Sequence, residues 1–200
     1  LEDNKKIEKI SEDTHNPAAN LLKRVSKEVD AYIVGGTIFE KFRGNYYNTC
    51  LFLKQGNILG KFRKMHLTDW EKKVKLHVGS TFKIFETEYC KAGILICADI
   101  FYPKTFRKLA SWGAEVIFLK VSASRPHPPV QGHPLTTKRA ENNRVFILKN
   151  GNTRSNSRGG NSAIISPWGI LNQAKDEINT KIISADLDIN KLRKYKKVCK

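Results

Sequence analysis

The stretch KAGILICADIFYPKTFRKLASWGAEVIFLKV, residues 91–121, contains two short apolar runs separated by a segment that a proline and a glycine delimit. Apolar runs of this length favour buried β-strands. Pro103 at the start and Gly113 at the end of the intervening segment predict a helix. The stretch therefore predicts a strand, a helix and a second strand in succession, with Cys97 at the point where the first strand ends.

Similar elements extend in both directions from this unit. Asn16 and Pro17 predict the N-cap and first turn of a helix. Further helices are expected at 134–144 and 188–197. Before residue 98 we expect a strand ending at glycines at 31–38, a hairpin at 45–62 and a strand pair at 80–87 and 90–97. Later strands are expected at 145–150, 161–170 and 181–187, with a polar loop at 151–160. Strands paired in hairpins and strands separated by helices together predict an α/β fold with mixed sheets and helices on their outer faces.

The composition indicates one domain, residues 1–200, that is large enough to bury a core. The longest apolar runs are too short to span a bilayer, so we expect no membrane partner. The four cysteines form no C-x-x-C pair and no zinc spacing with the five histidines, which favours a reduced, cytoplasmic setting. Because the chain starts at Leu1 and its sole methionine is Met65, we expect that its N-terminal part is absent.

The net charge of +17 raises the possibility of a nucleic-acid partner. The clearest cluster is KLRKYKKVCK at 191–200, within a basic C-terminal helix and tail at 188–200. Elsewhere lysine and arginine are spread along the chain, and no nucleic-acid-binding motif accompanies them. A solvated, lysine-rich surface explains the charge better.

Cys97 has two interpretations. A free cysteine at the end of an apolar strand is often a small core residue. A strand, a tight turn and a helix would instead hold a nucleophile at the sheet edge, where backbone N–H groups and the helix dipole favour a thiolate and an oxyanion.

Lys64 lies in GKFRKMHLTDWE, residues 60–71. If a strand ends near Lys61 and Phe62, alternation points Lys64 away from the direction of Arg63 and His66. A lysine beside a cysteine would stabilise a thiolate and a negative tetrahedral intermediate. Surface charge is the competing interpretation in a chain this basic.

Four segments together resemble the carbon–nitrogen hydrolase (nitrilase-like amidase) superfamily: GKFRKMHL, GILICADIFYP, RAEN and GGNSAIISPWG, in that order and at similar spacing. The resemblance covers about residues 20–190. It implies a four-layer α-β-β-α sandwich, with the first strand–helix unit missing from this chain. It also implies hydrolysis of small amides or nitriles without a cofactor or metal, and a homodimer or higher homo-oligomer.

The resemblance also implies site residues. Cys97 matches the nucleophile and Lys64 the lysine that stabilises the tetrahedral intermediate. Ala98 supplies a backbone N–H to the oxyanion, and Asp99 is expected to hydrogen-bond backbone near the turn. The family's third catalytic residue, a glutamate acting as general base, has no match here and is expected upstream of residue 1.

Glu71 falls where many members carry an accessory glutamate that helps to position the substrate; a plain surface glutamate is an equally good interpretation. Glu40 follows GGTIF, which aligns with a later strand of the family, so we do not assign it as the base. Arg139, in the segment RAEN, is expected to tie its helix to neighbouring strands. Lys104 departs from the family, which usually has a glutamate after this proline.

The sequence therefore predicts a cysteine-dependent amidase. Two alternatives remain open. One is a catalytically inactive family member that acts as a binding or scaffold protein, and the other is a basic nucleic-acid-binding domain.

Overall fold

The computed structural model forms two compact units, Leu1–Phe82 and Lys83–Lys200, which we describe one at a time. The prediction of a single domain stays a prediction. No helix among the described residues is both long and apolar enough to cross a membrane. The structure describes residues 7–8, 11, 17–122, 133–152, 161–174 and 179–198. The predicted N-cap Asn16 and most of the predicted loop at 151–160 lie outside these residues.

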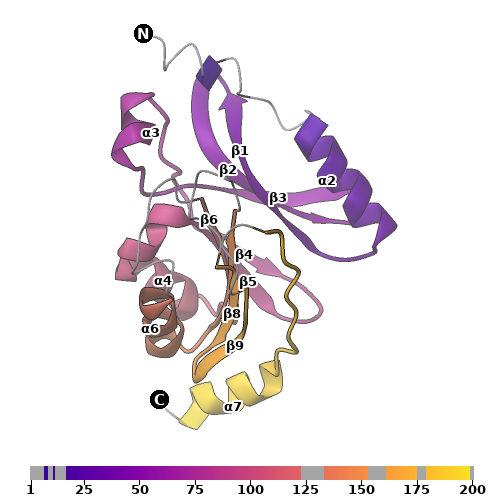
Figure 1. Cartoon of the computed structure of the whole chain (residues 1–200), viewed down its shortest axis with the longest axis vertical. Helices are drawn as coiled ribbons and strands as arrows, with labels where there is room; N and C mark the ends of the chain where they lie inside the picture. Colours follow the sequence, from indigo (N-terminus) through magenta and orange to yellow (C-terminus); the bar gives the residue numbers. More distant parts are fainter. Residues whose placement is uncertain are drawn as a thin grey trace. The chain divides into compact units, whose positions relative to one another are not determined.

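The first unit is an antiparallel sheet in the order β1-β2-β3 (Figure 1). Gln55 and Gly56 form the turn between β2 and β3 with φ values of 48° and 80°, as a tight hairpin turn requires. This confirms the predicted hairpin. The elements are α2 (Pro17–Glu28), β1 (Ile33–Phe42), β2 (Asn45–Lys54), β3 (Asn57–Arg63) and α3 (Asp69–Lys73).

The prediction that the first strand ends at its glycines is wrong. β1 continues past Gly35 to Phe42, with an irregularity in its pairing between Val34 and Thr37. A Cβ on Gly35 would lie 2.6 Å from Leu22 Cδ1 of α2. The glycine therefore allows the helix to approach the strand closely and does not end the strand.

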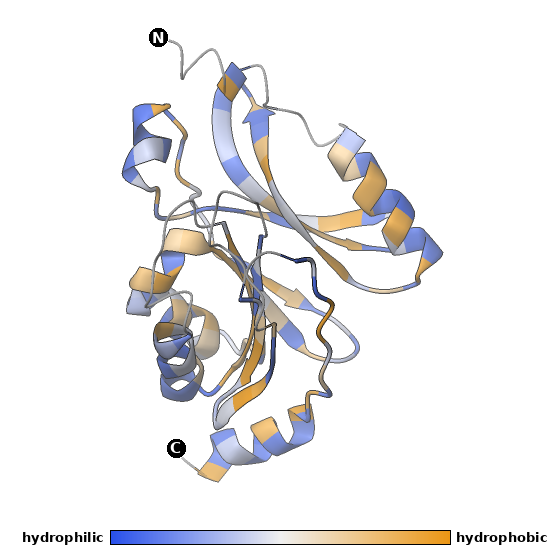
Figure 2. Cartoon of the chain, viewed as in Figure 1, coloured by the Kyte–Doolittle hydropathy of each residue, from blue (hydrophilic) through white to orange (hydrophobic). Residues whose placement is uncertain are grey.

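The second unit is a six-stranded mixed sheet in the order β4-β5-β6-β7-β8-β9. β5, β6 and β7 are parallel, and the other neighbours are antiparallel. Figure 2 shows apolar colour concentrated along these strands. The elements are β4 (Ile84–Glu86), β5 (Lys91–Ile96), the 3₁₀ helix η1 (Cys97–Phe101), α4 (Pro103–Ser111), β6 (Val116–Val121), α6 (Pro134–Asn143), β7 (Phe146–Gly151), β8 (Ala163–Ser166), β9 (Gly169–Gln173) and α7 (Ile189–Val198).

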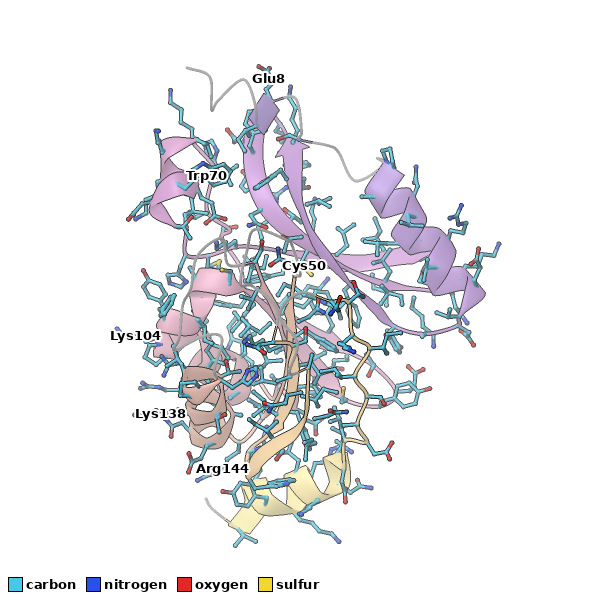
Figure 3. All side chains as sticks on the ribbon, in the orientation of Figure 1. Glu8, Cys50, Trp70, Lys104, Lys138 and Arg144 are labelled. Carbon is cyan, nitrogen blue, oxygen red and sulfur yellow. The ribbon has the colours of Figure 1, made fainter. Side chains whose placement is uncertain are left out.

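The strand–helix–strand unit is confirmed as β5, α4 and β6. Pro103 is the first residue of α4, and Gly113 follows the helix with φ of +94°, a conformation that favours glycine. The mixed sheet confirms the predicted α/β class. Lys104 is exposed in the first turn of α4 and points away from the sheet (Figure 3).

The predicted strand at 181–187 is absent, since these described residues form no regular element. The chain instead turns at Ser166, whose Oγ donates to Gly169 O at 2.9 Å, and β9 pairs antiparallel with β8. A local turn supplies the partner of β8 at once, before the later apolar segment is reached.

The predicted basic helix at 188–197 is α7. Leu192 is fully buried against the sheet. Arg193 binds the carboxylate of Glu115 at 2.6 Å, and Lys196 Nζ donates to Ala114 O at 2.7 Å. Two of the basic side chains of this helix therefore serve to dock it on its own unit.

Candidate active site

Cys97 lies at a sharp turn at the carboxyl end of β5. Its φ is +46°, in the left-handed region, and it is the first residue of η1. A non-glycine residue in this conformation costs on the order of 1–2 kcal/mol. Cys97 is also only partly buried. A partly accessible residue in a strained turn fits a functional position better than a place in the core.

Asp99 fixes the backbone on both sides of this turn. The carboxylate is fully buried, and its Oδ2 accepts the N–H of Ile96 at 2.9 Å. Thr105 Oγ donates towards Asp99 O at 3.2 Å and Tyr102 O at 2.6 Å. Asp99 therefore makes the expected backbone contact, and Ala98 is buried beside it within η1.

Arg139 reaches the same turn from α6. Its guanidinium is largely buried, and Nε donates to Ile100 O at 3.0 Å. The sequence predicted that this arginine ties its helix to neighbouring strands, but the contact is with η1. Since η1 begins at Cys97, Arg139 helps to fix the segment that carries the thiol.

Lys64 and Glu71 form a buried ion pair in the first unit. Lys64 Nζ lies 2.6 Å from Glu71 Oε2, and the two side chains are 2% and 5% exposed. Lys64 immediately follows β3, and its neighbour Arg63 is more exposed, as the alternation predicted. The surface interpretations of both residues are therefore wrong.

The carboxylate of Glu71 receives further donors. The N–H and Oγ–H of Thr68 donate to Oε2 at 2.7 and 2.9 Å, and Asn48 Nδ2 donates to Oε1 at 2.8 Å. Glu71 N–H in turn donates to Thr68 Oγ, which completes a capping box at the start of α3. Burial alone raises the pKa of Glu71, but Lys64, Thr68 and Asn48 together hold it below its ordinary value.

The backbone of Lys64 is held on both sides. Its N–H donates to Asn48 O at 2.9 Å, and its carbonyl accepts the N–H of Gly79 at 2.8 Å. A Cβ on Gly79 would lie 2.2 Å from Arg63 O. Only a glycine allows this close approach, which therefore sets the position from which the Lys64 side chain extends.

Glu40 is a buried carboxylate that is already fully engaged. Thr49 Oγ and Arg63 Nε each donate to Oε2 at 2.8 Å, while Arg63 Nη2 and Lys61 bind Oε1. Burial raises its pKa, but Arg63, Lys61 and Thr49 hold the pKa below its ordinary value. These contacts make Glu40 a poor proton acceptor, in agreement with its rejection as the base.

The structure thus brings the predicted site residues together in two groups. Cys97, Ala98 and Asp99 form the turn in the second unit, and Lys64 and Glu71 form the ion pair in the first. Across the described residues, no three histidine, cysteine, aspartate or glutamate side chains gather as metal ligands.

The contact between Asn48 and Glu71 could not be predicted from the sequence. The segment YYNTC indicated only a strand, and a contact between residues 23 positions apart leaves no local pattern. The capping box was detectable, since Thr68 and Glu71 have the Thr-x-x-Glu spacing that marks the start of a helix.

Comparison with known proteins identifies the family. The family model for carbon-nitrogen hydrolases matches residues 3–197. The chain belongs to the carbon–nitrogen hydrolase family. The omega-amidase NIT2-B of Xenopus laevis is 31% identical over 188 residues, covering 88% of this chain and 68% of the relative. The human omega-amidase NIT2 is 30% identical, with coverage of 86% and 66%. The chain spans about two thirds of the length of these relatives.

Solved structures of carbon–nitrogen hydrolases share the fold. Nit3 of Saccharomyces cerevisiae, a member of branch 10 of the nitrilase superfamily, has a TM-score of 0.82 at 26% identity, over 98% of this chain and 75% of that one. A carbon-nitrogen hydrolase from Helicobacter pylori G27 has a TM-score of 0.83 at 20% identity. These likenesses and the mixed sheets agree with the predicted α-β-β-α sandwich class.

Proposed function

We propose that this carbon–nitrogen hydrolase cleaves small amides through an acyl-enzyme on Cys97. The observation that carries the proposal is the strained, partly accessible position of Cys97 at the carboxyl end of β5, directly before η1. The buried Lys64–Glu71 pair supports it, because the carboxylate 2.6 Å from Lys64 Nζ fixes the direction of the lysine side chain.

In the proposed reaction, the thiolate of Cys97 attacks the carbonyl carbon and forms a C–S bond, and the π electrons move to the oxygen. The ammonium of Lys64 and the N–H of Ala98 stabilise this oxyanion. The first turn of a helix leaves such N–H groups without intrahelical partners. The C–N bond then breaks, and the amine leaves with a proton from the general acid.

Water attacks the resulting thioester, the C–S bond breaks, and the products are the carboxylic acid and the free thiol. The proton transfers are assigned to the glutamate base that the family resemblance implies, which has no match among residues 1–200. Glu71 is assigned an accessory part, which is to hold Lys64 and help to position the substrate.

The substrate class that we propose is small primary amides. The relatives carry the name omega-amidase, so carboxamides at the far end of a small acid are the first compounds to test. A cytoplasmic location and a homo-oligomer are part of the same proposal and rest on the cysteine usage and the family resemblance.

Alkylation and turnover test the role of Cys97. Cys50 is fully buried, and burial, partly offset by Thr87, raises the pKa of Cys90. Iodoacetamide should therefore label Cys97 before both. Cys97→Ala should abolish amide turnover, and Cys90→Ala is the matched control that retains it. Equal labelling of Cys50, Cys90 and Cys97, or an active Cys97→Ala variant, contradicts the proposal. A wild-type protein that turns over no amide would instead support the binding-protein alternative.

A further inference from the structure

Asn48 contacts both members of the buried ion pair through different groups. Its side-chain Nδ2 donates to Glu71 Oε1 at 2.8 Å, and its backbone oxygen accepts the N–H of Lys64 at 2.9 Å. Asn48 lies on β2, the strand on which Cys50 is labelled in Figure 3. One residue of the sheet therefore sets both the backbone that carries the lysine and the orientation of its carboxylate partner.

The donors around Glu71 divide unequally between its two oxygens. Lys64 and both donors of Thr68 bind Oε2. Among the described residues, Asn48 is the one that donates to Oε1. Without it, a buried anionic oxygen would lack a donor, and the carboxylate would rotate to share the Lys64 ammonium between its oxygens.

The side-chain oxygen of Asn48 shows that stability alone does not explain this residue. Oδ1 is buried and accepts no hydrogen bond within the described part of the chain. A buried acceptor without a donor costs about 1–3 kcal/mol of stability. The amide N–H of Asn48 is bonded to Glu71, whereas the amide oxygen has no donor within the described ranges. This arrangement fits a residue whose function is to donate to Glu71.

We infer that Asn48 is a positioning residue for catalysis, which orients the Glu71 carboxylate so that the Lys64 ammonium is held in one place for the oxyanion. The inference rests on the proposed function, because it assigns Asn48 a part in the same reaction. Asn48 acts through Glu71 and Lys64. Its loss should therefore lower kcat more than it raises KM.

Two substitutions separate positioning from a merely structural role. Asn48→Asp keeps the shape but places a second carboxylate against Glu71. Asn48→Ser removes the amide N–H without adding charge, and the shorter serine side chain holds its hydroxyl further from Glu71 Oε1. Both should lower kcat for an amide by about tenfold or more, the usual worth of a hydrogen bond to a charged group. Asn57→Asp is the matched control, because Asn57 is exposed at the start of β3 and, among the described contacts, its side chain bonds only to the Gln55 carbonyl.

Carboxyl ¹³C NMR of glutamate-labelled protein provides a readout that does not depend on turnover. The Glu71 pKa should rise in Asn48→Ser and rise further in Asn48→Asp, because the first loses a donor and the second gains a like charge. The acid limb of the kcat profile should move to higher pH in the same order. Asn57→Asp should change neither.

An unchanged Glu71 titration together with unchanged kcat in Asn48→Asp would overturn the inference. Equal loss of folded protein in both variants, with wild-type titration of the folded remainder, would also overturn it in favour of a structural role. If the Glu71 pKa rises as expected but the wild-type protein turns over no amide, the proposed function fails while the positioning of the ion pair stands.

Discussion

Removing the lysine of the buried ion pair should destabilise the protein strongly. Lys64→Met leaves the Glu71 carboxylate, 5% exposed, without its cation at 2.6 Å. Breaking a buried pair from one side costs about 3–5 kcal/mol, because the remaining charge loses its compensation. The double variant Lys64→Met/Glu71→Gln should recover most of this loss, since a neutral amide needs no counter-ion and can still accept from Thr68.

Urea unfolding at pH 7, followed by far-UV circular dichroism and tryptophan fluorescence, measures these free energies. Trp70 lies on α3 next to Glu71 (Figure 3), and it reports on this region once Trp112 and Trp168 are replaced by Phe. If Lys64→Met lowers the free energy of unfolding by less than about 1 kcal/mol, the pair contributes no more than an exposed ion pair does. An equal loss of unfolding free energy in Lys64→Met and in Lys64→Met/Glu71→Gln would also refute the reasoning.

The pair also predicts an acid dependence. The folded pKa of Glu71 lies below its ordinary value of 4.5. The stabilisation is therefore present above pH 4.5 and is lost as the pH falls through the folded pKa. Glu71→Gln should flatten stability against pH in this range, whereas an unchanged slope would show that Glu71 does not carry the effect.

Three further substitutions test other parts of the structure. Gly79→Ala places a Cβ 2.2 Å from Arg63 O and should cost about 1–3 kcal/mol, while Gly36→Ala, which meets nothing within 4 Å, should stay near wild type in thermal unfolding. Arg139→Met removes the hydrogen bond to the turn at η1. It should lower the free energy of unfolding by about 1–3 kcal/mol and slow the alkylation of Cys97. An unchanged alkylation rate would contradict the link between Arg139 and the turn. Burial and Lys149 lower the pKa of His133 to about 4, so the unfolded chain takes up the proton first and stability should decline as the pH falls from 6.5 to 4. His133→Asn should remove that decline in pH-dependent unfolding, because asparagine tolerates the φ of +66° at this position. A decline of wild-type size in the variant would refute the assignment.

Local signals predicted the elements that carry Cys97. Pro103 and Gly113 mark the ends of α4 by the backbone conformations that they favour, and the apolar runs on either side became β5 and β6. Alternation after β3 likewise predicted that Lys64 points away from Arg63, and the structure shows Lys64 to be the buried one of the two. These features depend on neighbours in the sequence, so the sequence alone reveals them.

Features that depend on distant partners could not be predicted. Glu71 lies on α3, and its burial depends on contacts with Asn48 on β2 and with Lys64, so the sequence left its surface interpretation open. Gly35 suggested a strand end, but the approach of Leu22 from α2 explains the glycine. The segment 181–187 has strand-like composition but forms no strand, because β8 pairs with β9.

The most direct test of the central claim is to identify the acylated residue during turnover. The wild-type protein should be mixed with a small primary amide, quenched in acid and analysed by intact-mass and peptide mass spectrometry. A mass increase equal to the acyl group, located on Cys97 and absent from Cys97→Ala, is the predicted result. Amide turnover that continues in Cys97→Ala, or an acyl group on a different residue, would contradict it.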